Sequence, residues 1–217
     1  MPRYCHSRRA PHADWEDSAL GPWHRGPMST PSEPVEALLV VDVQNAFVTG
    51  DGAAPAAEQL LTNLGELVAR ARSAAVLIVH LQNDGPPGAV DEPGQPGWEL
   101  YFPVVESDHE VVVRKAEDDG FDGTRLGELL QDRGVRRVGL GGLMSEMCVL
   151  ATARAALSLG LGVVMPHDGH ATYNIGPAPG ATEGVPAAMA SRVAEWALGD
   201  QVEIVAHTTD VVFTLPA

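Results

Sequence analysis

Short apolar runs alternate along this chain with stretches of helical periodicity, and this alternation limits the possible folds more than any other feature. The apolar runs, rich in Val, Leu and Ile, lie at 37–43, 75–81, 110–114, 138–141, 162–165 and 202–206. Such continuous runs are typical of strands that are covered on both faces. The stretches between them predict helices at 58–73, 124–133, 145–159 and 186–198, with Thr124 as an N-cap and Gly160 following the third helix.

Strands that alternate with helices in this way predict a parallel sheet with helices on both faces. We therefore expect an α/β protein, a single three-layer α/β/α domain with a mostly parallel six-stranded sheet, over residues 35–217. Residues 1–34 lack periodicity and are rich in Pro, His, Arg and Ser, so we expect a disordered N-terminal extension, in which Met28 is a second candidate start of translation.

The composition narrows the classes of partner. The net charge of −15 predicts a surface that repels nucleic acid and anionic membranes and attracts cationic ligands. No stretch approaches the roughly 18 apolar residues of a membrane span, and the arginines near the N-terminus are not followed by the apolar part of a secretory signal. Cys5 and Cys148 offer no disulfide framework, so we expect a cytoplasmic protein.

Three reactive side chains follow the carboxyl ends of predicted strands: Asp42, Lys115 and Cys148. Ligands of open α/β sheets bind at this edge. Each residue alone has a structural explanation, as a turn residue, a solvated lysine or a small core residue. Their convergence at one edge favours a functional site.

Cys148 has the strongest local case because it follows a glycine-led turn, 141–147, into a predicted helix. Backbone N–H groups in the first turn of a helix lower the pKa of a thiol and can bind an oxyanion. A neighbouring carboxylate could take the thiol proton, and an ammonium group could stabilise the thiolate. This pattern indicates nucleophilic catalysis.

Three segments together resemble the isochorismatase-like cysteine hydrolases. They are LVVDVQNAF at 39–47, VRK at 113–115 with GF at 120–121 and GTRL at 123–126, and GGLMSEMCVLATA at 141–153. They occur in the order of that family, and the resemblance extends from Val35 to Ala206.

The resemblance implies a triad in which Asp42 accepts and later donates a proton, Lys115 gives electrostatic support and Cys148 is the nucleophile. It implies hydrolysis of an amide C–N bond through a thioester, with no cofactor. It also implies a cis peptide at Leu143–Met144, with the backbone N–H groups of Met144 and Cys148 facing the oxyanion. Members of the family commonly associate, which predicts a homodimer or larger homo-oligomer.

Two departures from other branches of the family bear on the substrate. Nicotinamidases carry an Asp-x-His pair and a further His as metal ligands, whereas this chain reads HLQND at 80–84; we interpret His80 as a satisfied histidine and predict no metal. Isochorismatases cleave an enol ether without a thiol nucleophile, so Cys148 favours an amide substrate.

The C-terminal segments 168–174 and 185–200 resemble a further branch, the streptothricin hydrolases, which open the streptolidine lactam of a polycationic antibiotic. Glu117, followed by Asp118 and Asp119, would suit a cationic substrate, although a solvated acidic loop also explains this run. The segment 84–109, dense in Pro and Gly, favours a lid or binding loop. The candidates to line the pocket are Phe47, Trp98, Tyr101, Glu117 and Tyr173, with core packing as the competing explanation for Phe47 and Tyr173.

Two alternatives remain open from the sequence. The chain could hydrolyse a small neutral amide, as nicotinamidases and N-carbamoylsarcosine amidases do. It could also be a catalytically inactive, thiol-sensing binding module, in which Cys148 reacts with peroxide but turns over no amide.

Overall fold

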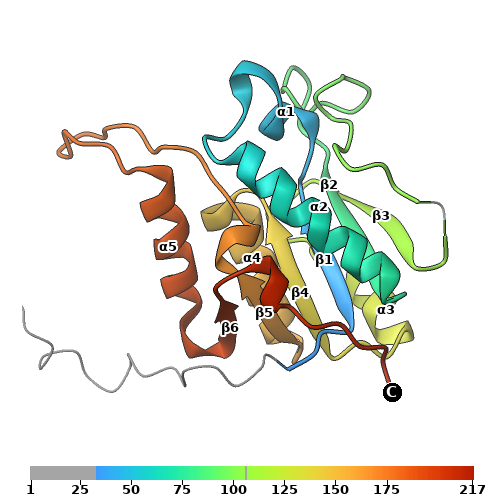
Figure 1. The fold of residues 1–217 in the computed structure, drawn as a ribbon. Helices are drawn as coiled ribbons and strands as arrows, with labels where there is room; N and C mark the ends of the chain where they lie inside the picture. Colours follow the sequence, from blue (N-terminus) through green and yellow to red (C-terminus); the bar gives the residue numbers. More distant parts are fainter. Residues whose placement is uncertain (1–32, 106) are drawn as a thin grey trace, which may run out of the picture. The chain divides into compact units, whose positions relative to one another are not determined.

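A computed structural model describes residues 33–105 and 107–217 of the chain. Its strands form one six-stranded sheet in the order β3-β2-β1-β4-β5-β6, and every pair of neighbouring strands is parallel (Figure 1). The strands are β1 (Ala37–Val41), β2 (Leu77–Asn83), β3 (Glu110–Lys115), β4 (Arg137–Gly142), β5 (Gly162–Pro166) and β6 (Val202–Val205). The predicted fold class is confirmed. Residues 1–32 of the expected N-terminal extension lie outside the described residues.

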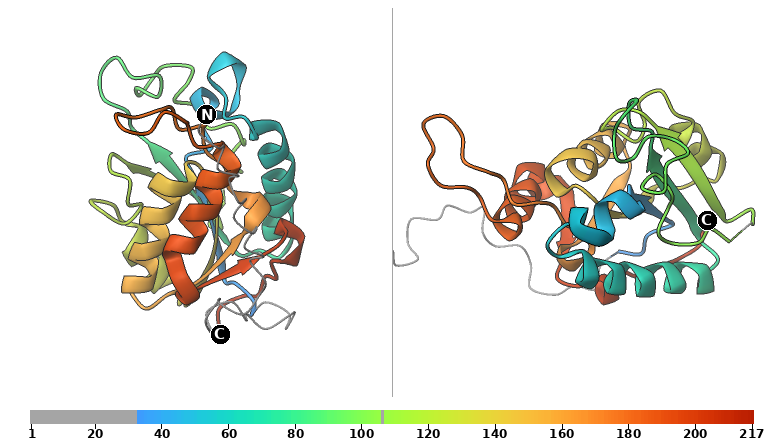
Figure 2. Two further views of the ribbon diagram at one scale, coloured as in Figure 1. Left: turned by 90° about the vertical axis from the view of Figure 1, so that its left-hand side faces the viewer. Right: turned by 90° about the horizontal axis from the view of Figure 1, so that it is seen from above.

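Helices cover both faces of the sheet (Figures 1 and 2). One face carries α2 (Ala57–Ser73), and the other carries α3 (Leu126–Asp132), α4 (Leu150–Ser158) and α5 (Ala187–Leu198). Alternate residues of β1 serve the two cores: Leu38 and Val40 pack with α2, and Leu39 and Val41 pack with the opposite layer. This arrangement explains why the strands read as continuous apolar runs.

The chain winds outward from β1 to β3 and then returns to the other side of β1 with β4. Such a reversal creates a crevice at the carboxyl ends of the two central strands, where ligands of open α/β sheets bind. Val41, the last residue of β1, pairs with Leu81 of β2 and Gly142 of β4. The segments that follow these strands therefore meet at one edge.

Two predicted helix boundaries are wrong. The helix predicted at 124–133 begins at Leu126, with Arg125 at the cap position; the Thr124 hydroxyl accepts the Leu126 N–H at 3.2 Å but donates to the carbonyl of Gly120 at 2.7 Å. The helix predicted at 145–159 is interrupted. Residues Ser145–Val149 form a wide π-type turn with a non-helical backbone at Met147, and α4 begins only at Leu150.

Two irregular segments flank the carboxyl edge of the sheet. The loop at 84–109 is attached to the segment after β1 and to the short helix α1 (Asn45–Val48), since Asn45, Ala46 and Tyr101 donate backbone hydrogen bonds across the two segments. A lid function of this loop stays a prediction. Residues 174–186 form an arm that stands away from the body (Figures 1 and 2), joined across its base by hydrogen bonds between Ile175 and Val185.

The C-terminal residues lie at the opposite end of the sheet, beside the start of β1. Val35 donates its N–H to Val212 at 2.8 Å and accepts the N–H of Thr214 at 3.0 Å. Within the described part of the chain, no helix is both long and apolar enough to cross a membrane.

Candidate active site

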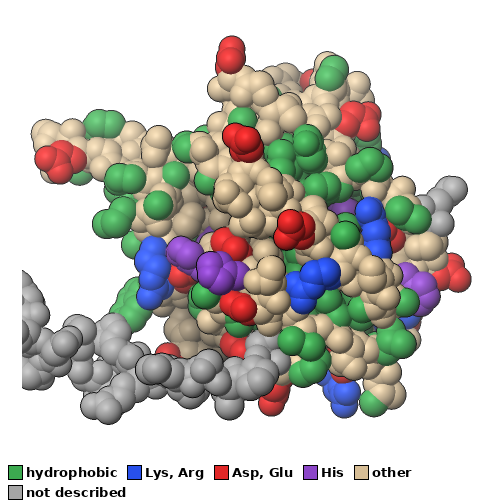
Figure 3. Space-filling view, viewed as in Figure 1, with side chains coloured by type: hydrophobic (Ala, Val, Ile, Leu, Met, Phe, Trp, Pro, Cys, Tyr) green, Lys and Arg blue, Asp and Glu red, His purple; other side chains and the backbone are tan. Residues whose placement is uncertain are grey.

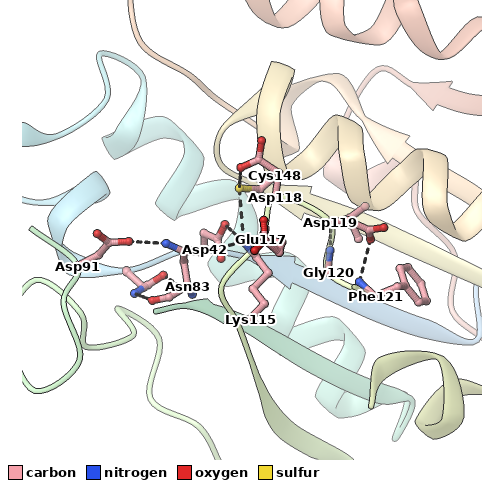
Figure 4. A network of polar contacts seen from close by, with 12 residues as sticks. Asp42, Asn83, Asp91, Lys115, Glu117, Asp118, Asp119, Gly120, Phe121 and Cys148 are labelled. Atoms are coloured by element: carbon pink, nitrogen blue, oxygen red, sulfur yellow. Dashed lines mark hydrogen bonds and ion pairs between the residues drawn. The ribbon is translucent and has the colours of Figure 1, made fainter. Parts of the chain in front are cut away.

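The structure brings together the three side chains singled out in the sequence (Figure 4). Lys115 Nζ lies 2.8 Å from Asp42 Oδ2 and 3.4 Å from Cys148 Sγ. Asp42 follows β1, Lys115 ends β3 and Cys148 lies in the turn after β4. The three residues are 1%, 3% and 8% exposed, so a thiol, a carboxylate and an ammonium group meet in a largely water-excluded place.

Lys115 is held by acceptors from several segments. Besides Asp42 and Cys148, its ammonium group donates to the backbone carbonyl of Glu117 at 3.1 Å and to Asn83 Oδ1 at 3.4 Å. Burial alone would lower the pKa of Lys115, but its neighbours Asp42 and Cys148 outweigh burial and raise the pKa above its usual value. The site therefore contains a permanent positive charge.

Asp42 combines an unusual backbone with a demanding environment. Its φ of 49° turns the chain sharply after β1, and its N–H remains bonded to the carbonyl of Leu81 at 3.0 Å. Burial raises the pKa of Asp42, with Lys115 opposing that rise. Asp42 Oδ1 is buried and has no hydrogen-bond partner among the described residues. A carboxylate with a raised pKa and one unpaired oxygen is well suited to receive a proton.

The thiol of Cys148 is neutral at rest. Burial raises its pKa well above the usual value, Asp42 adds to the rise and Lys115 opposes it. This net direction is opposite to the lowered pKa expected for a thiol at a helix N-terminus, because Cys148 lies inside the π-type turn, ahead of α4, and faces a buried carboxylate.

The turn that carries Cys148 has a cis peptide at Leu143–Met144, as the family resemblance implies. The carbonyl of Met144 accepts the N–H groups of Met147 and Val149 at 3.0 and 3.2 Å. The oxyanion hole formed by the N–H groups of Met144 and Cys148 stays a prediction.

The three consecutive acidic residues that follow Lys115, at 117–119, make different contacts. Glu117 contributes its backbone carbonyl to Lys115, and its side chain is exposed. Asp118 brings its carboxylate to the nucleophile, where Cys148 Sγ donates to Asp118 Oδ1 at 3.6 Å. Asp119 accepts the N–H of Phe121 at 2.8 Å and so fixes the local turn (Figure 4). Sequence reasoning proposed Glu117 for the pocket and missed the contact of Asp118.

The aromatic candidates lie mainly in supporting positions. Phe47 and Tyr173 pack against the core on the α2 side, and Tyr173 donates its hydroxyl to the carbonyl of Gly52 at 2.7 Å. Trp98 donates Nε1 to Asp84 Oδ1 at 2.9 Å. Tyr101 is 42% exposed. Packing accounts for the contacts of Phe47 and Tyr173, and a pocket role for any of the four stays a prediction.

His80 is buried, and its Nε2 lies 2.9 Å from Glu110 Oε1. Burial lowers the pKa of His80, with Glu110 opposing. Its ring is thus satisfied within the fold by a carboxylate of the neighbouring strand.

A group of hydrogen-bonded side chains that lies next to the triad was not identified from the sequence. Gln44 donates to the carbonyls of Asn83 at 3.0 Å and Trp98 at 2.9 Å, and Asn83 Nδ2 donates to Asp91 Oδ2 at 2.6 Å. Asn83 ends β2, so the strand-end rule that found Asp42 could have found it as well. Asp91 comes from the irregular loop, where no sequence pattern indicates its position.

At the carboxyl edge of this parallel α/β sheet, a thiol lies beside a carboxylate and an ammonium group. This is the kind of site found in enzymes that use a cysteine nucleophile. The chain belongs to the isochorismatase family, because the family model for the isochorismatase domain matches residues 36–196. It is a hydrolase that acts on amide carbon–nitrogen bonds, and a small-molecule amide fits it as substrate.

Comparisons with individual proteins agree with this assignment. A streptothricin hydrolase of Streptomyces noursei is 59% identical over 187 residues, which cover 86% of this chain and 74% of that protein. An isochorismatase from Pseudomonas putida KT2440 shares the fold, with a TM-score of 0.75, 22% identity, and coverage of 85% and 94% of the two chains. The N-carbamoylsarcosine amidase of Thermoplasma acidophilum matches with a TM-score of 0.59 and 28% identity over 63% of this chain and 83% of that one.

Proposed function

We propose that the chain opens a cyclic amide, the streptolidine lactam of streptothricin, with Cys148 as nucleophile and a thioester intermediate. The observation that carries the reaction type is the contact of one ammonium group, Lys115 Nζ, with both Asp42 Oδ2 and Cys148 Sγ. The high identity to a streptothricin hydrolase supports the substrate.

The proposed reaction begins with a neutral thiol. As Cys148 Sγ bonds to the amide carbon, its proton passes to Asp42, whose raised pKa and unpaired Oδ1 favour this transfer. Lys115 stabilises the carboxylate of Asp42 before the transfer and the negative charge that develops on sulfur as the proton leaves it. The backbone N–H groups of Met144 and Cys148 bind the carbonyl oxygen when it becomes an oxyanion.

The second half of the reaction reverses the proton transfer. Asp42 donates its proton to the amine nitrogen, and the C–N bond breaks to leave a thioester on Cys148. Asp42 then takes a proton from a water molecule that attacks the thioester carbon, and the thiol is regenerated with that proton. The net change is the addition of one water across the amide bond.

Negative charge beside the nucleophile supports a cationic substrate. The carboxylate of Asp118 lies beside the nucleophile, and the whole chain has a net charge of −15. A positively charged group next to the reacting carbonyl would meet Asp118 as the carbonyl reaches Cys148 Sγ. Association of the chain into a homodimer or larger assembly remains a prediction from the family resemblance.

Mass spectrometry of substrate and protein tests the proposal. Purified protein is incubated with streptothricin, nicotinamide and N-carbamoylsarcosine, with Cys148→Ala as the matched variant. We expect streptothricin to gain one water with the wild type and not with Cys148→Ala. Because a lactam keeps its amine after opening, the trapped acyl-enzyme should carry the full mass of the antibiotic on Cys148.

Other outcomes would redirect the proposal. Turnover of nicotinamide or N-carbamoylsarcosine in place of streptothricin would keep the triad and remove the antibiotic as substrate. Streptothricin opening that persists in Cys148→Ala would remove the nucleophile. Oxidation of Cys148 by peroxide, without turnover of any of the three amides, would favour the thiol-sensing alternative.

A further inference from the structure

A second polar network lies behind the turn that carries Cys148, and the proposed chemistry does not use it. Ser145 Oγ lies 2.8 Å from His170 Nδ1, and His170 Nε2 lies 3.1 Å from Glu195 Oε1. Ser145 Oγ also lies 2.9 Å from Ser191 Oγ. The network thus runs from α5, which carries Ser191 and Glu195, through the segment after β5 to the residue that opens the π-type turn.

The inner part of this network is sealed from water. Ser145 is 1% exposed, and the side chains of His170 and Glu195 are 0% and 2% exposed. A buried serine with no path to substrate has no use as a nucleophile. Buried polar groups of this kind cost free energy unless every partner is present, so a satisfied network fixes the segments that it joins.

The hydrogen-bond directions follow from the charge of Glu195. Burial alone would raise the pKa of Glu195, but hydrogen bonds from His170 and His167 outweigh burial and lower the pKa, so the carboxylate is ionised and can only accept. His170 Nε2 therefore donates to Glu195. The other ring nitrogen, Nδ1, is the atom that contacts the Ser145 hydroxyl, and the same hydroxyl contacts Ser191.

Backbone contacts join the same segments. Ser145 donates its N–H to the carbonyl of Ala171 at 3.0 Å, and Ala171 donates to the carbonyl of Gly142 at 3.1 Å. Thr172 donates its hydroxyl to Glu146 Oε1 at 2.8 Å. The segment 170–172 is therefore held to both ends of the stretch between β4 and Cys148.

The outer side of Glu195 faces the surface. His167 and Arg192 both contact its carboxylate, with Arg192 Nη1 at 3.2 Å from Glu195 Oε2. Figure 3 shows histidine, arginine and acidic side chains gathered on this face of the molecule. His167 shares the Glu195 contact with His170, but its side chain is 54% exposed and is not bonded to Ser145.

We propose that Glu195, His170 and Ser145 form a positioning network in which the packing of α5 sets the geometry of the turn that carries Cys148. The inference rests on the proposed role of Cys148 as nucleophile. These residues do not touch the reacting atoms; they keep Sγ and the neighbouring backbone N–H groups in place. Their loss lowers the rate of the chemical step more than the affinity for substrate.

Two amide substitutions at position 170 separate the ends of the network. His170→Asn places an amide near the position of Nδ1 and keeps a partner for Ser145. His170→Gln places an amide near the position of Nε2 and keeps a partner for Glu195. His167→Gln is the matched control, because it alters a histidine on the same carboxylate that is not bonded to Ser145.

We expect His170→Gln to lower kcat by roughly 10- to 100-fold, since a displacement of about 1 Å at a reacting group has that order of effect. KM should change little, His170→Asn should retain more activity than His170→Gln, and His167→Gln should match the wild type. Circular dichroism and thermal unfolding establish that each variant is folded. A rise in KM at constant kcat, or equal losses in His170→Gln and His167→Gln, would overturn the positioning role.

A second measurement does not depend on the substrate. The rate at which iodoacetamide alkylates Cys148 is followed against pH in the wild type, His170→Gln and His167→Gln. A loosened turn admits water to a thiol whose neighbours are Asp42, Lys115 and Asp118, so the midpoint should move to lower pH in His170→Gln alone. A folded His170→Gln with the wild-type alkylation profile would refute the coupling, even if the wild type hydrolyses none of the amides tested.

Discussion

At the scale of single residues, the pKa values of Asp42 and Cys148 favour the proton transfer of the proposed mechanism. Burial raises the pKa of both Asp42 and Cys148, so the resting thiol keeps its proton while the acceptor becomes more basic. Lys115 contacts both groups and is charged throughout. In the proposed mechanism, transfer of the proton from sulfur to carboxylate would therefore take place between two groups that contact the same ammonium group.

The raised pKa of Asp42 predicts the acid limb of the pH–rate profile. The base form of Asp42 is lost as the pH falls through its pKa, so kcat/KM should decline at a higher pH than an ordinary carboxyl group would give. Asp91 contributes to this rise through its negative charge. Asp91→Asn should therefore move the acid limb to lower pH and retain turnover.

Asp42→Asn is the companion variant. It should lower kcat by about 10²- to 10⁴-fold, the usual contribution of a general base. An Asp91→Asn enzyme whose acid limb is unmoved would show that a group other than Asp42 controls this part of the profile.

Asp118 offers a test of substrate charge. Asp118→Asn should raise KM for streptothricin by about 2- to 5-fold, the range expected for one exposed ion pair, and the effect should shrink at high salt. Asp119→Asn makes the same change of charge one residue further on and keeps an acceptor for the Phe121 N–H, so its KM should be unchanged. Equal effects of the two variants would indicate general attraction by the acidic loop.

At the scale of elements, the end of β4 depends on one glycine. Gly142 has a φ of 135°, and a Cβ at this position would lie 2.0 Å from the carbonyl oxygen of Val41. Gly142→Ala must therefore shift the backbone between β1 and the turn that carries Cys148. We expect a loss of more than about 2 kcal/mol in unfolding free energy, together with a large fall in kcat.

Gly139→Ala is the control on the same strand. A Cβ at Gly139 would lie 3.4 Å from Val35 Cγ2, an ordinary contact, and the backbone is not left-handed. Chemical denaturation should show this variant close to the wild type. If both variants were equally stable, the approach of β4 to Val41 would not limit the site.

Elements with strong periodicity could be predicted from the sequence, and the site only in part. The apolar runs gave all six strands because parallel strands are buried on both faces. Asp42 and Lys115 could be found because they lie at the carboxyl ends of such strands, Asp42 directly after β1 and Lys115 as the last residue of β3. The break at Met147 and the contact of Asp118 with Cys148 could not, since both depend on how a loop packs against the turn after β4.

The Ser145–His170–Glu195 network shows a second limit of sequence reasoning. Its members come from the turn after β4, the segment after β5 and α5, and 25 positions separate Ser145 from His170, as they do His170 from Glu195. Ser, His and Glu at such distances have no shared periodicity. Only the packing of α5 against the π-type turn brings them together.

At the scale of the whole molecule, the first described residues differ in how firmly they are held. Val35 is fully buried and bonded to the C-terminal segment at both of its backbone groups, and Glu36 pairs with Arg136 at 2.8 Å. Glu33 is 82% exposed, and its ion pair with Arg137 at 3.5 Å is of the weak surface kind. The boundary of the folded unit at residue 35 stays a prediction.

A shortened chain tests this boundary. A protein beginning at Glu33 should unfold at the same temperature as the full chain and retain its kcat. A protein beginning at Leu38 loses Val35 and its hydrogen bonds to the C-terminal segment, and it should be markedly less stable by calorimetry. If the protein that begins at Glu33 were much less stable than the full chain, residues before Glu33 would belong to the folded unit.

The pairing of Val35 with the C-terminal segment also fixes the direction in which an attached catalyst would face. Because Thr214 bonds to Val35 at the start of β1, the last residues leave the domain at the edge opposite Asp42 (Figure 1). A bead or an electrode coupled through Ala217 would therefore hold the molecule by its base. The edge of the sheet that carries Asp42, Lys115 and Cys148 would then face the surrounding solution and stay open to substrate in a flow reactor.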